Sequence, residues 1–227
     1  MTQSDATRLG PITTLAQWVF SIAKWLAPMH WLRKSCPLLR YRSELSQKEV
    51  RSLDFTRRRV KAVDIYVLSY VAVEVVLVTC ACLVHLPLVV AWLAILIVGL
   101  RIIEIMQVTV NATVFDQLAG RPDNRVASKP RMVVLAILNF AELCLCFGVV
   151  YALNISLLHG TGRAATGFYF SVITQLTIGY GDVHPISVLR VVAALQGLIG
   201  VVFVVLVLAR LIATLPRIDS VLDRGRR

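Results

Sequence analysis

The chain has 227 residues, of which 57% are hydrophobic and only 16% are charged, and its formal net charge is +11. A soluble domain of this length carries more charge, so the composition indicates a membrane protein. No nucleic-acid partner is expected, because the basic residues flank long apolar runs instead of forming a separate polar region.

Four apolar stretches are long enough to cross a bilayer, whose hydrocarbon core requires roughly 20 helical residues. They run from about Val63 to Leu86, from Pro87 to Val110 with a helical continuation to Phe115, from Met132 to Ile155, and from Ile186 to Leu211. Basic residues gather before the first stretch, between the second and third, and after the fourth. Because cytoplasmic loops carry the excess of Lys and Arg, both termini are predicted to be cytoplasmic. The expected location is the cell (plasma) membrane, crossed several times.

The N-terminal segment has an amphipathic pattern of its own. Apolar residues recur there at helical spacing, namely Leu15, Trp18, Val19, Ile22, Trp25, Leu26 and Met29. Basic residues follow at Arg33, Lys34, Arg40 and Arg42. The pattern predicts a helix in the headgroup layer, with anionic lipids as partners. A helix packed against the rest of the protein is the alternative. No removable signal peptide is expected, because the N terminus lacks the basic, apolar and small-residue pattern of one.

A shorter segment, from about Ala164 to Asp182, lies between the third and fourth stretches and is too short and too polar to span. It begins with small residues, becomes aromatic at Phe168–Phe170 and ends in a glycine-rich turn. This pattern predicts a re-entrant half-helix followed by an extended loop. Such a backbone is tolerated at membrane depth only where it is buried in protein or lines an aqueous pore.

The end of this segment reads Thr177-Ile178-Gly179-Tyr180-Gly181-Asp182. Turning successive carbonyl groups to one side of an extended segment demands unusual backbone angles, which glycine tolerates. The side chains of Ile178 and Tyr180 must then point away, into surrounding packing, while Thr177 can add its hydroxyl at the inner end.

With the aromatic half-helix before it, this segment resembles the pore signature of the potassium channel superfamily, whose filters surround the ion with carbonyl oxygens. The resemblance extends from Met132 to about Leu211 as outer helix, pore helix, filter and inner helix. It implies K⁺ binding at Thr177, Ile178, Gly179 and Tyr180, with Gly181 completing the filter. One filter per chain implies a homotetrameric pore.

Three positions depart from the family pattern. Leu176 stands where relatives commonly have Thr, and Ile173 stands where some have a Glu that pairs with the Asp after the filter. Tyr169 stands where many relatives have a Trp that holds this Asp, so its hydroxyl is expected to support Asp182. In the inner helix, Gly200 falls near the gating-hinge position and Gly197 is a second candidate. Close helix packing through a small residue is the alternative.

The implied organisation has five parts. We expect an N-terminal segment at 1–60, a hairpin of two extra spans at 61–116, a basic linker at 117–131, a pore module at 132–214 and a cytoplasmic tail at 215–227. The predicted fold is therefore an all-α membrane protein with four transmembrane helices, a re-entrant pore helix and a filter loop. Two extra spans with one basic residue do not make a standard voltage sensor.

Ionisable residues within apolar spans usually have partners, and the candidates here are Glu74, Arg101, Glu104 and Glu142. Glu74 and Arg101 match in depth to within roughly 5 Å at 1.5 Å per residue, and Glu104 shares a helix face with Arg101. We therefore expect an intramembrane cluster with Arg101 paired to Glu74, joined by Glu104 or Glu142. It is either a structural pair that docks the hairpin on the pore or a sensor of voltage or protons.

The sequence thus predicts a passive, potassium-selective channel subunit. The five cysteines lack metal-ligand spacing and no catalytic constellation is present, so neither a cofactor nor enzymatic activity is expected. The alternative is a non-conducting accessory or scaffold protein that keeps a pore-like fold. A non-selective cation channel is disfavoured because Tyr180 and both filter glycines are intact.

Overall fold

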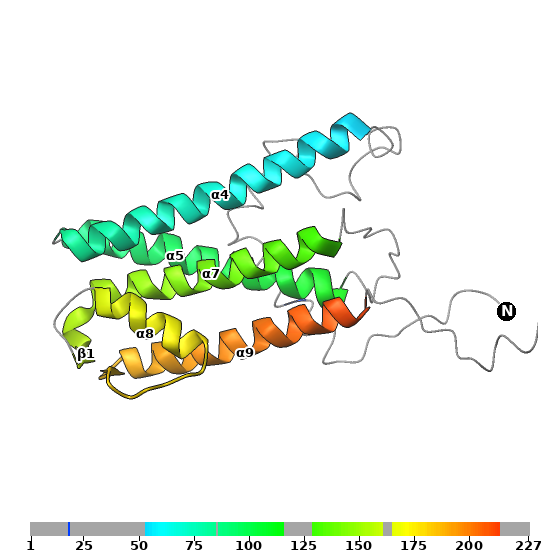
Figure 1. Cartoon of the computed structure of the whole chain (residues 1–227). Coiled ribbons are helices and arrows are strands. Elements are labelled where there is room, and N and C mark those ends of the chain that lie inside the picture. Colours follow the sequence, from blue (N-terminus) through cyan, green and yellow to red (C-terminus); the bar gives the residue numbers. More distant parts are fainter. Residues whose placement is uncertain (1–17, 19–52, 85, 116–128, 161–164, 214–227) are drawn as a thin grey trace, which may run out of the picture.

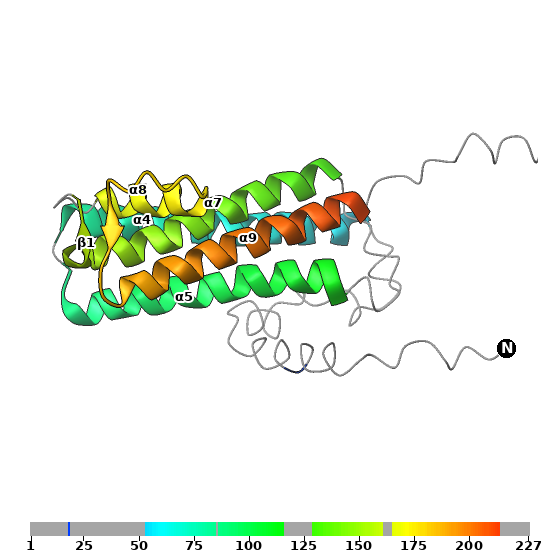
Figure 2. The ribbon, with the colours of Figure 1, turned by 90° about the horizontal axis from the view of Figure 1, so that it is seen from below.

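The computed structural model describes residue 18 and residues 53–84, 86–115, 129–160 and 165–213. Four helices in this part of the chain are long and apolar enough to cross a membrane. They are α4 (Leu53–Leu83), α5 (Leu88–Val110), α7 (Lys129–Leu153) and α9 (Leu189–Ala213). The four predicted spans are confirmed, and the long helices run side by side in both views (Figures 1 and 2). The described part of the chain thus has the expected all-α membrane fold.

The first two spans form a hairpin whose turn follows from proline chemistry. Pro87 precedes α5 with φ −56° and ψ 146°, which is an extended conformation. This extended residue separates α4 from α5, because proline does not continue a helix that comes before it. At its other end α5 continues into one π-helical segment, η3 (Asn111–Phe115), so the predicted continuation to Phe115 is present.

The predicted half-helix is α8 (Ala165–Gln175), which lies between α7 and α9 at one end of the bundle (Figure 1). Before it come a short 3-10 helix, η4 (Ile155–Leu157), and strand β1 (Leu158–His159); after the loop comes strand β2 (His184–Pro185). The strands pair antiparallel, with Leu158 opposite Pro185 and His159 opposite His184. This strand pair was not predicted, because two residues are too few to show a strand period.

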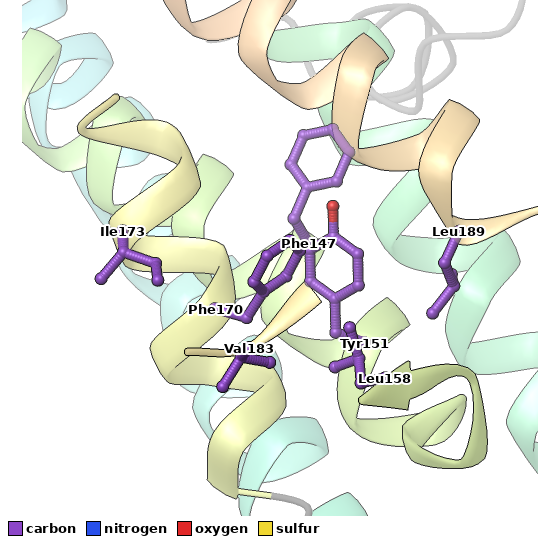
Figure 3. Close-up of a cluster of buried hydrophobic side chains, with 7 residues drawn as sticks. All are labelled: Phe147, Tyr151, Leu158, Phe170, Ile173, Val183 and Leu189. Atoms are coloured by element: carbon purple, nitrogen blue, oxygen red, sulfur yellow. The ribbon is translucent and has the colours of Figure 1, made fainter. Parts of the chain in front are cut away.

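A buried cluster holds α8 against its neighbours (Figure 3). It combines side chains of α7, α8, α9, strand β1 and the loop before β2, namely Phe147, Tyr151, Leu158, Phe170, Ile173, Val183 and Leu189. The rings of Tyr151 and Phe170 meet edge to face at 4.9 Å, a favourable aromatic geometry. The backbones of α7 and α8 approach closely because Gly167 has no side chain: a Cβ there would lie 2.5 Å from the backbone nitrogen of Ala152. The loop after α8 therefore starts from a firmly placed helix.

Candidate functional site

The loop after α8 has left-handed backbone angles at every second residue. The φ angles are 56° at Thr177, 58° at Gly179 and 79° at Gly181. In a β-strand successive peptide groups face opposite sides, whereas alternation with left-handed residues turns them toward the same side. The loop can therefore present a row of backbone groups to one partner.

Glycine is required at two of these positions by conformation and not by crowding. In the part of a single chain that the structure describes, a Cβ at Gly179 or Gly181 would have no heavy atom within 4 Å, yet a positive φ disfavours every residue with a side chain. Thr177 adopts such an angle although it is β-branched, which stores strain of order 1–3 kcal/mol. Backbone hydrogen bonds from Thr177 to Thr174 (3.1 Å) and from Ile178 to Ile173 (2.9 Å) hold this start of the loop on α8.

The apolar side chains of the loop are not packed within one chain. Tyr180 is 70% exposed, Leu176 is 49% exposed and Ile178 is 46% exposed. Large apolar residues along α9, such as Val201 and Val205, are exposed as well. A single chain therefore does not supply the surrounding packing that the sequence predicts for Ile178 and Tyr180.

The end of the loop is tied to α8 through Asp182. Tyr169 donates a hydrogen bond from its hydroxyl to Oδ2 of Asp182 (2.8 Å), and Val183 donates from its backbone nitrogen to Oδ1 (3.0 Å). The contact expected between Tyr169 and Asp182 is thus present. The hydrogen bond to the carboxylate raises the pKa of the Tyr169 phenol above its ordinary value. Ile173, at the position of the missing Glu, is buried in the apolar cluster instead.

A buried network of polar side chains, which the sequence did not predict, lies between α7, α8 and α9. Gln196 of α9 donates from Nε2 to the Ser171 carbonyl oxygen (2.8 Å), Ser171 Oγ (3.0 Å) and Gln175 Oε1 (3.1 Å). Its Oε1 accepts from the Tyr151 hydroxyl (2.8 Å), and Ser171 in turn donates to the Cys144 carbonyl oxygen (2.8 Å). This network joins α7, α8 and α9. The available signal was a lone glutamine within the apolar fourth span, since such residues usually have partners.

The two candidate hinge glycines differ in their surroundings. A Cβ at Gly200 would lie 2.8 Å from Nε2 and 3.2 Å from Cδ of Gln175, whereas a Cβ at Gly197 would meet none of the described residues within 4 Å. Helix α9 runs through both positions. Gly200 therefore provides close packing against α8, and a hinge at either glycine stays a prediction.

The four charged residues of the predicted intramembrane cluster lie in α4, α5 and α7, and three of them are directly joined. Arg101 forms ion pairs with Glu142 (2.7 Å) and Glu104 (3.0 Å), all with side chains no more than 4% exposed. Tyr66 donates its hydroxyl to both oxygens of Glu104 (2.8 and 2.9 Å). The Arg101 guanidinium also lies 4.5 Å from the ring centre of Tyr70, a cation–π contact.

The expected direct pair of Arg101 and Glu74 is replaced by another arrangement. Glu74 is buried beside the other groups, but its Oε1 accepts from Cys146 Sγ (3.2 Å). Among the described residues, Oε2 of Glu74, Oε1 of Glu142 and Nε of Arg101 have no hydrogen-bond partner. Matching depth along two helices did not determine which faces meet, and α7 supplies the nearer carboxylate. The cluster nevertheless joins α4 and α5 to the outer helix α7.

The N-terminal amphipathic helix lies outside the described residues except for Trp18, which is helical and 65% exposed. Its contact with anionic lipids therefore stays a prediction. The expected linker between the second and third spans also falls mainly outside the described residues.

Comparison with known families identifies the kind of protein to which this loop belongs. Residues 140–216 match the family model described as "Ion channel". The match runs from α7 through α8 and the loop to the end of α9. The chain therefore carries an ion-channel domain in this region. No match was found among the curated proteins or among the solved structures.

Proposed function

We propose that this protein is a subunit of a homotetrameric channel that conducts K⁺ passively and selectively. The observation that carries the proposal is the alternation of positive φ angles at Thr177, Gly179 and Gly181. This geometry suits a row of carbonyl oxygens that replaces the hydration shell of K⁺, as in filters of this type. The binding positions would be Thr177, Ile178, Gly179 and Tyr180, with the permeant ion as the only ligand.

A four-chain assembly is supported by the apolar side chains that are exposed to solvent in a single chain. Four filter loops around one axis complete a ring of ligands at each level, and neighbouring chains would cover the exposed side chains of Ile178 and Tyr180. The exposed apolar face of α9 would then line the shared pore and the contacts between subunits. Channels of this family are not in general enzymes, and we propose no catalytic role.

The proposed orientation places the filter outside and both termini in the cytoplasm of a cell whose plasma membrane holds the channel. The start of α7 and the end of α9 lie at the end of the bundle opposite the strand pair (Figure 1). Arg131 and Arg210 lie near these helix ends, which suits the cytoplasmic excess of basic residues.

Ion flux in liposomes that contain only this protein tests the proposal. We expect uptake of K⁺ and Rb⁺ down their gradients, with Na⁺ flux close to that of protein-free liposomes. Equal flux of K⁺ and Na⁺ would identify a non-selective cation channel. No flux from protein that native mass spectrometry shows to be tetrameric would favour a non-conducting accessory or scaffold role.

A further inference from the structure

Two histidines face each other on the strand pair beside the loop. His159 belongs to β1 and His184 to β2, and they are directly opposite in the antiparallel register. Their imidazole rings are stacked, with centroids 5.5 Å apart and planes inclined by 19°. Both side chains are exposed. Neither imidazole takes part in the filter geometry or in the contacts that hold Asp182.

The backbone beneath these side chains is held in place from both strands. Ile186 donates a backbone hydrogen bond to the Leu157 carbonyl oxygen (2.9 Å), and Leu158 and Val183 are buried in the apolar cluster. Directly opposed residues have Cβ atoms about 4.5–5.5 Å apart. Rotation of two exposed side chains can therefore bring one nitrogen from each ring to a single ion at about 2.0–2.1 Å, without movement of the backbone.

We propose that His159 and His184 together form a binding site for a borderline transition-metal ion of the class of Ni²⁺, Cu²⁺ or Zn²⁺. Imidazole suits these ions, whereas Ca²⁺ and Mg²⁺ require oxygen ligands. Among the described residues no group of three or more His, Cys, Asp or Glu side chains could hold a metal, so water completes the coordination. The site is open and binds more weakly than a closed structural site.

The position of the pair connects this site to the end of the loop. Asp182 lies two residues before His184 in the chain. Gly160, which follows His159, packs directly against the backbone of Asp182, because a Cβ at Gly160 would clash with the Asp182 carbonyl oxygen. An ion that joins the two histidines therefore restrains both chain segments beside Asp182. Because the ion binds the folded strand pair, it also stabilises the folded protein.

Metal binding by the full-length, tag-free protein in detergent tests this site. Calorimetry with Ni²⁺ should show one ion per chain, and the Cu²⁺ electron paramagnetic resonance spectrum should show coupling to two imidazole nitrogens. His159→Asn and His184→Asn should each weaken Ni²⁺ binding by about tenfold or more, and the double variant should lose it. His30→Asn is the matched control and should bind as the wild type does.

Two results would overturn the proposal. One is Ni²⁺ uptake by the wild type that does not exceed that of the double variant. The other is loss of binding in only one of the two single variants, which would assign the ion to one histidine and different groups. The copper spectrum of the wild type gives an answer even if a variant misfolds, because coupling to fewer than two nitrogens contradicts the pair. None of these measurements needs ion flux, so failure of potassium conduction and failure of this site are separate outcomes.

Discussion

At the scale of single residues, the loop after α8 has positive φ angles at two glycines and at one residue with a side chain, Thr177. Gly179 and Gly181 have room for a side chain but not the backbone angle for one. Thr177 shares the left-handed angle and keeps its side chain, at a cost that the hydrogen bonds at the end of α8 offset. Backbone strain of this kind gathers at functional positions, and we propose that the Thr177 hydroxyl acts at the inner end of the filter.

Alanine at either filter glycine should abolish potassium flux without preventing assembly. In Gly179→Ala and Gly181→Ala the added methyl group meets no neighbour, but it disfavours the positive φ that the loop requires. Gly99→Ala is the matched control, because Gly99 is helical and its added methyl group also meets no described residue within 4 Å. Planar-bilayer recordings measure the current. Wild-type current from either filter variant would contradict the filter assignment.

Removal of the Tyr169 hydroxyl should weaken the outer end of the loop and leave selectivity unchanged. Tyr169→Phe deletes the donor to Asp182, so we expect a smaller steady-state potassium current with the same preference for K⁺ over Na⁺. Tyr169→Trp, with a ring N–H, should restore part of the current. A current equal to that of the wild type in Tyr169→Phe would mean that Asp182 does not need this contact.

The same contact gives a pH dependence with a defined sign. The hydrogen bond raises the pKa of Tyr169 above the ordinary value of about 10. The hydrogen bond from Tyr169 to Asp182 is therefore fully formed when the pH is below the ordinary pKa of tyrosine. It is lost as the pH rises through the raised pKa of Tyr169. The difference in current between wild type and Tyr169→Phe should be constant at neutral pH and should vanish in strongly alkaline solution.

At the scale of helices, α9 contacts the pore helix through Gln196 and Gly200. Gln196 binds Ser171 and Gln175 of α8, and Gly200 leaves space for the side chain of Gln175. Gln175 is buried and its oxygen is already bound. Its side chain cannot move away from α9 without loss of that hydrogen bond.

Alanine at the two inner-helix glycines distinguishes packing from hinge function. Gly200→Ala should displace the side chain of Gln175 and lower the free energy of unfolding by about 1–3 kcal/mol. An overpacked core and an unpaired polar group both destabilise the folded state. Gly197→Ala should be neutral or stabilising, since alanine favours a helix by up to about 1 kcal/mol. Unfolding in detergent measures both. Equal effects of the two substitutions on stability, with altered opening in both, would favour a hinge.

The buried ion pairs should show coupling between Arg101 and the outer helix. Arg101→Leu leaves Glu142 without its partner and should lower stability by about 3–5 kcal/mol. Addition of Glu142→Leu should restore most of this loss, because it removes the stranded charge. Glu74→Leu is the control substitution in the same background: Glu74 contacts Cys146 instead of Arg101, so it should rescue less. Equal rescue by both second substitutions would contradict the assigned pairing.

At the scale of the whole molecule, the hairpin and the pore domain are joined mainly through α7. Apolar contacts between α5 and α7 include Ala94, Val98 and Val149, and the Arg101–Glu142 pair lies in the same interface. An ion pair between Arg131 and Asp64 connects α7 with α4 at the other end of the span. The first two helices are therefore attached to α7, which also packs against α8.

The N-terminal segment should bind anionic membranes independently of the pore. An isolated peptide of about residues 11–42 should bind vesicles that contain anionic lipid, and less strongly as salt rises, because screening shortens the reach of its basic residues. Deletion of this segment should leave ion selectivity unchanged and alter open probability. A peptide that ignores vesicles would mean that the apolar stripe packs on protein.

Much of this architecture was predictable from local patterns. The length of an apolar run determines a span. Most of the predicted helix ends therefore lie within a few residues of the ends in the structure. The glycine alternation and the aromatic half-helix predicted the pore loop, because both signals are contained in consecutive residues. The contact of Tyr169 with Asp182 was also expected, since α8 and the loop are adjacent in the chain.

Only the tertiary structure decided which helix faces meet. Sequence position determines depth along a helix, at 1.5 Å per residue, but rotation about the helix axis depends on packing against neighbours. Arg101 therefore pairs with Glu142 of α7 instead of Glu74 at similar depth. For the same reason the Gln196 network and the opposed pair of His159 and His184 became visible only when segments 21 or more residues apart were brought together.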